Sequence, residues 1–74
     1  MKQLDAKGLI CPLPVLKARK ALVAMAAGER LEITVTDDAA PKDFALFCEE
    51  AGHRLLSVQE QDSVFVVTVE RGSA

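Results

Sequence analysis

The stretch Gly8–Lys20, with the sequence GLICPLPVLKARK, decides the fold because it begins as a turn and becomes a helix. Proline is favoured at the first position of a helix, where its missing N–H has no partner anyway. Pro12 therefore predicts that a helix begins there and that Cys11 is its N-cap, with Pro14 as the third helical residue. Cysteine is a poor cap by preference, so its place there indicates that sulfur itself is needed.

The chemistry expected at this junction is that of a reactive thiol. The free N–H groups of the first turn, on Leu13 and Val15, are expected to lie near the sulfur, and the helix dipole also favours an anion there. Both effects predict a lowered pKa and a nucleophilic thiolate at Cys11. The alternative is that Cys11 is an ordinary small buried residue and that the prolines only start a helix.

This region resembles the signature of the TusA/SirA family of small sulfur-carrier proteins. The shared features are an acidic residue, Asp5, a glycine three residues later, Gly8, and the Cys-Pro-x-Pro pattern of Cys11, Pro12 and Pro14. Softer matches follow over nearly the whole chain, at Thr36–Asp38, Asp43–Phe44, Phe47–Cys48, Gly52–His53 and Leu55–Leu56. The chain has Ile10 and Ala45 where many members have a basic residue and a proline.

Length and composition restrict the class of protein. Seventy-four residues predict one domain, residues 1–74, and half of them are hydrophobic. The net charge of −2 gives no overall attraction to nucleic acid or to anionic lipid. No signal peptide and no membrane-spanning run is visible, so a cytoplasmic location is expected. The two cysteines are too few and too far apart for a disulfide framework.

Hydrophobic periodicity predicts six elements. Two helices are expected over residues 12–27 and 41–51, ended by Gly28 and Gly52. Four strands are expected over residues 4–6, 31–36, 54–59 and 64–70, with a polar turn at 61–63 and a frayed end at 71–74. The last strand has a nearly continuous apolar run, which is typical of a strand inside a sheet.

The same patterns predict which side chains are buried. In the first helix an apolar stripe is formed by Val15, Ala18, Leu22 and Met25, and Leu16 and Val23 widen it. In the second helix the residues that share one face are Phe44, Phe47, Cys48 and Ala51, so Cys48 is expected to be a small core residue. In the third strand Leu56 and Val58 are expected to face inward.

The order β-α-β-α-β-β predicts an α+β fold, a two-layer α/β sandwich with a four-stranded mixed sheet and both helices on one face. The family resemblance implies the same fold, which is likened to the C-terminal domain of a translation initiation factor. That likeness concerns the fold and does not imply RNA binding.

Other polar residues offer weaker signals. Asp37 and Asp38 could form a metal or acid–base pair, but adjacent carboxylates after a strand are more typical of a turn before a helix. His53 is expected in a surface turn, because one histidine and two distant cysteines do not match the ligand spacing of a known metal site. Neither a metal nor a cofactor is therefore predicted.

Three basic residues follow the cysteine in the first helix: Lys17, Arg19 and Lys20. Their simplest interpretation is a solvated helix face. The alternative is a docking surface for an acidic partner, placed next to Cys11.

Two classes of function are compatible with these patterns. In the first, Cys11 carries sulfane sulfur as a persulfide, and no second cysteine lies nearby in the sequence to convert it into a disulfide. The resemblance implies a cysteine desulfurase or rhodanese-like donor and a DsrE/TusD-type acceptor, in tRNA thiolation, molybdenum-cofactor supply or sulfur oxidation.

The alternative is a regulatory or nucleic-acid-binding module that uses the basic helix face. The acidic net charge and the absence of Trp and Tyr argue against direct nucleic-acid binding.

Overall fold

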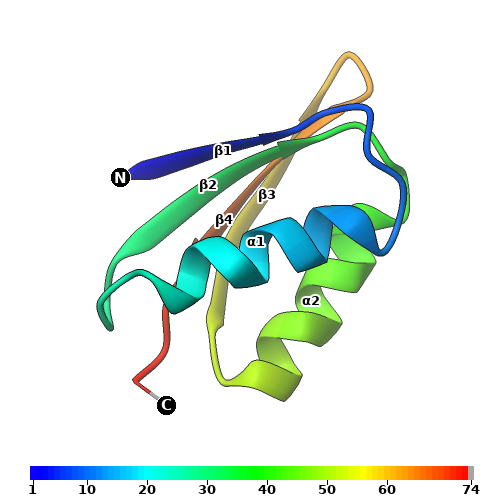
Figure 1. Ribbon diagram of the computed structural model, residues 1–74. Coiled ribbons are helices and arrows are strands. Elements are labelled where there is room, and N and C mark those ends of the chain that lie inside the picture. Colours follow the sequence, from blue (N-terminus) through cyan, green and yellow to red (C-terminus); the bar gives the residue numbers. More distant parts are fainter. Residues whose placement is uncertain (74) are drawn as a thin grey trace.

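The computed structural model describes residues 1–73 as six elements in the order β-α-β-α-β-β (Figure 1). The strands are β1 Lys2–Ala6, β2 Arg30–Val35, β3 Arg54–Gln61 and β4 Val64–Glu70. The helices are α1 Leu13–Val23 and α2 Ala40–Ala51. The predicted order of elements and the α+β class are confirmed. No helix in this part of the chain has the length and apolar character that crossing a membrane requires.

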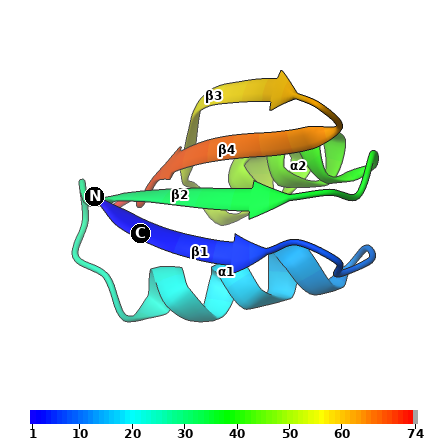
Figure 2. The same ribbon diagram turned by 90° about the horizontal axis from the view of Figure 1, so that it is seen from above.

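The four strands form one mixed sheet in the order β1-β2-β4-β3, which Figure 2 shows from above. β1 and β2 are parallel, whereas β4 is antiparallel to both of its neighbours, β2 and β3. β4 therefore lies inside the sheet, as its continuous apolar run predicted. The pairing of β1 with β2 also brings the carboxyl ends of these two strands to the same edge of the sheet.

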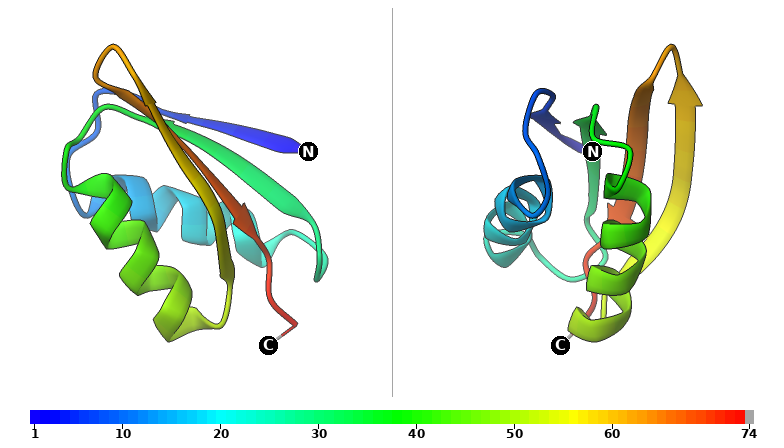
Figure 3. Two further views of the ribbon diagram at one scale, coloured as in Figure 1. Left: turned by 180° about the vertical axis from the view of Figure 1, so that it is seen from behind. Right: turned by 90° about the vertical axis from the view of Figure 1, so that its right-hand side faces the viewer.

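Both helices cover one face of the sheet (Figures 1 and 3), so the predicted two-layer sandwich is confirmed. α1 packs on β1 and β2, and α2 packs on β3 and β4. Side chains of β2 alternate accordingly: Leu31, Ile33 and Val35 are buried, and the polar residues between them are partly exposed. This alternation is typical of a sheet with one covered face and one wet face.

The apolar stripe predicted for α1 is buried along its centre, but the buried face is narrower than predicted. Ala18, Leu22 and Met25 are buried in the core. Leu16 and Val23 are exposed, by 50% and 74%, so the prediction that they widen the buried stripe is wrong. A helix that packs on one sheet buries only a limited arc of its surface, and these two side chains lie outside that arc.

α1 ends at Val23 rather than near residue 27, and backbone groups around its end are hydrogen-bonded to side chains outside the helix. The Nε atom of Arg71 donates a hydrogen bond to the Leu22 carbonyl at 2.9 Å, and the backbone N–H of Ala26 donates to Glu29 Oε1 at 2.6 Å. Gly28 has a φ of +86° but stands in the following turn, so it is not the residue that ends the helix.

α2 matches its prediction closely. Pro41 lies in its first turn, where the lost N–H costs nothing. At the other end Gly52 has a φ of +80°, and the N–H groups of Gly52 and His53 both donate to the Cys48 carbonyl. A left-handed glycine at this position is a common helix C-cap.

The prediction that Leu56 and Val58 are buried is wrong, since both are more than a third exposed. The register of β3 shifts between Leu55 and Ser57, so Leu56 falls at a bulge. Val58 pairs with the buried Val67, but β3 is the edge strand and its hairpin with β4 extends beyond the helices (Figure 1). Leu55, rather than Leu56, packs against the core.

The chain after β4 is held in place and does not fray as predicted. Arg71 exchanges backbone hydrogen bonds with Gly28 and Glu29, at 2.9 and 2.8 Å. The Gly72 N–H donates to His53 Nδ1 at 3.0 Å, so His53 is partly buried and not a free surface residue. Ala74, the last residue of the predicted frayed end, lies outside the described residues.

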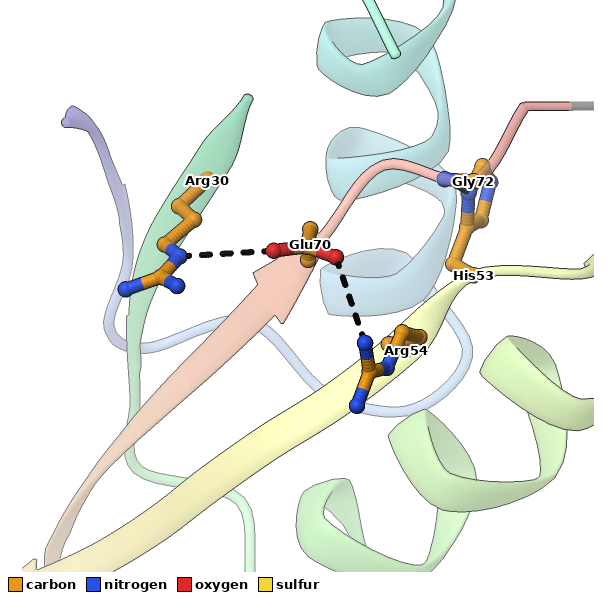
Figure 4. Close-up of polar contacts among 5 residues, drawn as sticks. All are labelled: Arg30, His53, Arg54, Glu70 and Gly72. Atoms are coloured by element: carbon orange, nitrogen blue, oxygen red, sulfur yellow. Dashed lines mark hydrogen bonds and ion pairs between the residues drawn. The ribbon is translucent and has the colours of Figure 1, made fainter. Parts of the chain in front are cut away.

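Figure 4 shows the ion pairs at this end of the sheet. Glu70 of β4 lies between Arg30 of β2 and Arg54 of β3, with N–O distances of 3.5 and 3.8 Å. All three are cross-strand neighbours in the sheet register. The pairs link the three strands at the end opposite to the β1–α1 loop.

Candidate functional site

The β1–α1 and β2–α2 loops lie side by side, because both leave the sheet at the carboxyl ends of the parallel strands β1 and β2 (Figure 1). Two hydrogen bonds join them. The Gly8 N–H donates to Thr36 Oγ1 at 2.9 Å, and the Cys11 N–H donates to Asp37 Oδ2 at 2.6 Å. The backbone of the cysteine is thereby fixed to the neighbouring loop.

The motif residues before the cysteine shape its loop. Asp5 Oδ1 accepts a hydrogen bond from the Lys7 N–H at 3.0 Å, which closes a tight turn after β1. Gly8 follows with a φ of +82°, a conformation that glycine adopts without a steric penalty. The Nζ atom of Lys17 donates to the Asp5 carbonyl at 2.8 Å and so connects α1 to the same turn. Asp5 and Gly8 therefore shape the loop that carries the cysteine.

The start of α1 differs from the prediction by one residue. The helix begins at Leu13 with Pro12 as its N-cap, so Cys11 is not the N-cap and precedes the helix. The Cys11–Pro12 peptide bond is cis. The Leu13 N–H donates to the Ile10 carbonyl at 2.9 Å and is not available to the sulfur. Pro14 is the second helical residue and is buried against the fold.

The pKa of the Cys11 thiol is raised, which contradicts the predicted thiolate. The main cause is a hydrogen bond between the thiol and the Asp43 carboxylate; desolvation and the negative charges of Asp43 and Asp37 add to it. A full negative charge close to a thiol disfavours its ionisation. The helix dipole amounts to only about half a charge and acts mainly within the first turn, which Cys11 precedes. In the free protein the carboxylates therefore outweigh the dipole.

Cys11 opens into a shallow cavity of about 220 Å³ between the starts of the two helices. Its remaining lining residues are Pro12, Val15, Asp43, Leu46, Phe47 and Glu50. Most of this lining is apolar, and the two acidic side chains both come from α2. The sulfur thus lies at the edge of a groove that is apolar along its floor and negatively charged on one wall.

Cys48 has the opposite environment. It is 2% exposed within the core, and burial raises its pKa to about 11. The prediction that it is a small core residue is confirmed. Of the two cysteines, both of which are free thiols, Cys11 alone is exposed.

Comparison with known proteins agrees with this geometry. Residues 2–71 match the sequence model of the family described as sulfurtransferase TusA. The chain belongs to the TusA sulfurtransferase family. Membership supports a role in carrying sulfur, between a donor and an acceptor, and it confirms the predicted family.

Individual relatives cover almost the whole chain. A Neisseria meningitidis serogroup A protein, whose name provisionally calls it a sulfur carrier, is 51% identical over 90% of each chain. The sulfur carrier protein TusA of Allochromatium vinosum is 39% identical over 95% of this chain and 92% of its own. The crystal structure of a SirA-like protein from Desulfitobacterium hafniense is 32% identical, covers 97% of this chain and 99% of its own, and superposes with a TM-score of 0.84.

The three basic residues do not share one surface. Successive helical residues are about 100° apart around the axis, so Lys17 and Lys20 lie close together and Arg19 points elsewhere. Arg19 lines a second cavity between the helices, together with Leu22, Val23, Phe47, Ala51, His53 and Arg71. The predicted basic face is therefore not continuous. Arg19 lies at this second cavity, whereas Lys17 and Lys20 lie on another side of α1.

The acidic residues at Cys11 were not predicted as part of the site. Asp37 was interpreted as turn chemistry, and Asp43 and Glu50 were not singled out. Asp43, Leu46, Phe47 and Glu50 are spaced at three and four residues, so one face of α2 was visible in the sequence. What was missing is the position of that face beside the cysteine. Within residues 1–73, no three His, Cys, Asp or Glu side chains form a metal-binding group.

The contrast between the two cysteines predicts their rates of alkylation. At neutral pH iodoacetamide should modify Cys11 at least about ten times faster than Cys48, because a thiol must be accessible and ionised to react. The rate at Cys11 should continue to rise above neutral pH, because its raised pKa keeps the thiolate fraction low there. Site-resolved mass spectrometry measures both. A Cys11 rate that levels off in mildly acidic buffer would contradict the effect of the carboxylates.

Proposed function

We propose that Cys11 accepts sulfane sulfur as a persulfide and passes it to an acceptor protein. The observation that carries the proposal is the exposure of the Cys11 sulfur at the edge of the inter-helix groove, while Cys48 is buried. Membership of the TusA family supports the carrier role in general. A persulfide on an exposed residue is accessible to a partner, and the only other cysteine lies in the core, away from it.

Each transfer is a substitution at sulfur. The Cys11 thiolate attacks the outer sulfur of a donor persulfide, a new S–S bond forms at Cys11, and the donor's S–S bond breaks. The donor leaves as a thiolate, which can take up the proton that Cys11 has lost. An acceptor thiolate then attacks the outer sulfur of the Cys11 persulfide in the same way. The exchange is redox-neutral overall and requires no cofactor.

The partners would be proteins that carry reactive sulfur themselves. A cysteine desulfurase or a rhodanese-like protein would supply sulfur, and a DsrE/TusD-type protein would accept it, for tRNA thiolation, cofactor synthesis or sulfur oxidation in the cytoplasm. Lys17 and Lys20 on the outer side of α1, and Arg19 at the second cavity between the helices, are candidates for contacts with an acidic partner surface. Long-range attraction between such surfaces mainly accelerates association.

The proposal predicts that the protein can be loaded with sulfur. Incubation with a cysteine desulfurase and cysteine should add the mass of one sulfur atom to the intact protein, and a reductant should remove it. Peptide mapping should place the added sulfur on Cys11. A protein that gains no sulfur, even from glutathione persulfide as a direct donor, would contradict the proposal.

A further inference from the structure

Negative charge is concentrated around the exposed thiol of Cys11. Asp37 accepts the Cys11 backbone N–H at 2.6 Å, and Asp43 and Glu50 line the same cavity as Cys11. These groups come from two different parts of the chain, the β2–α2 loop and α2. The arrangement is unexpected for a nucleophile, because carboxylates oppose ionisation of a thiol.

Among the described residues 1–73, no ion pair joins these carboxylates to a basic side chain. The lining of the cavity includes neither Lys nor Arg, and the two ion pairs found within residues 1–73 both involve Glu70 at the other end of the sheet. Asp43 and Glu50 lie on the same face of α2, about two helical turns apart, and both line the cavity. The groove therefore presents unneutralised negative charge beside the sulfur.

The floor between these charges is apolar and accessible. Val15 of α1 faces Leu46 and Phe47 of α2 across the cavity, and Leu46 is 56% exposed. Ile10, next to the cysteine, is 72% exposed. Apolar side chains in contact with unpaired charge at an open groove fit a ligand that supplies both an aliphatic group and a cation.

We propose that Asp43 couples docking to sulfur exchange: a partner segment with a Lys or Arg beside an aliphatic side chain binds the groove, pairs with Asp43 and Glu50, and frees the Cys11 thiol to ionise. This inference rests on the proposed function of Cys11 and names the chemistry of the partner that this groove admits. Asp43 acts through Cys11 and is a positioning residue.

The physical consequence is a thiol that is reactive mainly inside a complex. In the free protein the Asp43 carboxylate beside the cavity raises the pKa of the Cys11 thiol, so the proton stays on sulfur, and thiols react much more slowly than thiolates with oxidants and electrophiles. A cation that pairs with Asp43 offsets its charge. The proton then leaves to solvent or to the departing donor thiolate, and the exchange proceeds as described above.

The alternative is that Asp43 has a purely structural role, and the test must distinguish this role from the coupling role. It lies in the first turn of α2, where a negative charge stabilises the helix through its dipole. Replacing it by Asn should therefore lower the melting temperature slightly in either case. A structural role alone would not change how Cys11 distinguishes charged reagents or how its reactivity depends on pH.

The test uses two thiol reagents that differ in charge, the cationic 2-(trimethylammonium)ethyl methanethiosulfonate and the anionic 2-sulfonatoethyl methanethiosulfonate. Wild-type Cys11 should react faster with the cation, and Asp43→Asn should reduce the cation-to-anion rate ratio by roughly fivefold, the order expected for loss of one nearby charge. The pH profile of Cys11 alkylation should also move to lower pH. Asp62→Asn, at the distant β3–β4 turn where Asn tolerates the positive φ of 53°, is the matched control for net charge.

Each outcome decides the inference. An unchanged rate ratio and pH profile in Asp43→Asn, or an equal change in Asp62→Asn, would overturn it. Loading with glutathione persulfide, a small anionic donor, should be faster in Asp43→Asn than in the wild type. If the wild type accepts no sulfur while the reagent ratios change as expected, the carrier function fails and the electrostatic role of Asp43 stands.

Discussion

Replacing Cys11 by serine is expected to abolish sulfur acceptance completely while the protein remains folded. A serine hydroxyl does not form a stable adduct that corresponds to a persulfide. It is also far less acidic than a thiol, so it supplies no anion to attack a donor at neutral pH. Cys11 is exposed and precedes α1, so the substitution should change the free energy of unfolding by no more than about 0.5 kcal/mol. Intact mass after incubation with a desulfurase and cysteine gives the readout, and circular dichroism checks the fold.

Cys48→Ala is the matched control, because it removes the other thiol of the chain. Cys48 is buried in α2, so its truncation should cost about 1 kcal/mol of stability. The variant should nevertheless accept sulfur as the wild type does. Sulfur uptake by Cys11→Ser, or a folded Cys48→Ala protein that accepts none, would move the carrier role away from Cys11.

The fold could be predicted because its elements are marked by local patterns. Alternation in residues 31–35 identifies β2, and Pro41 and Gly52 mark the ends of α2. The errors lie where a distant residue decides the outcome. At the end of α1, for example, the Leu22 carbonyl accepts a hydrogen bond from Arg71, which is 49 positions away. No periodicity in the helix itself carries that information.

In the candidate site, too, residues that are close in sequence could be predicted, whereas contacts between distant segments could not. Cys11, Pro12 and Pro14 are neighbours in sequence, so their motif was visible. Asp37 accepts the Cys11 backbone N–H, and Asp43 lines the cavity at Cys11, only because β1 and β2 pair in parallel, which brings the loops after them together. For this reason the predicted direction of the pKa shift at Cys11 was wrong. The local helix dipole could be anticipated from the prolines, whereas the opposing carboxylates come from the next loop and helix.

Phe44→Ala is expected to destabilise the protein more than any substitution at the groove. Phe44 is 0% exposed, is among the largest fully buried side chains, and lies in the core cluster with Ile33 and Val67 of the sheet. Truncating a buried phenylalanine costs about 3–5 kcal/mol. At roughly 0.05–0.15 kcal/mol per residue, a chain of this length has only about 4–11 kcal/mol in total. Urea unfolding followed by circular dichroism should show the loss.

Leu46→Ala provides the comparison on the same helix. Leu46 lies two residues after Phe44 and is 56% exposed at the groove, so its truncation should change the free energy of unfolding by no more than about 0.5 kcal/mol. Equal losses for the two variants would mean that α2 is rotated from the orientation described here. Because Asp43 precedes Phe44 directly, such a rotation would also remove its carboxylate from Cys11. The pair of variants therefore tests the packing that places the acidic wall of the groove.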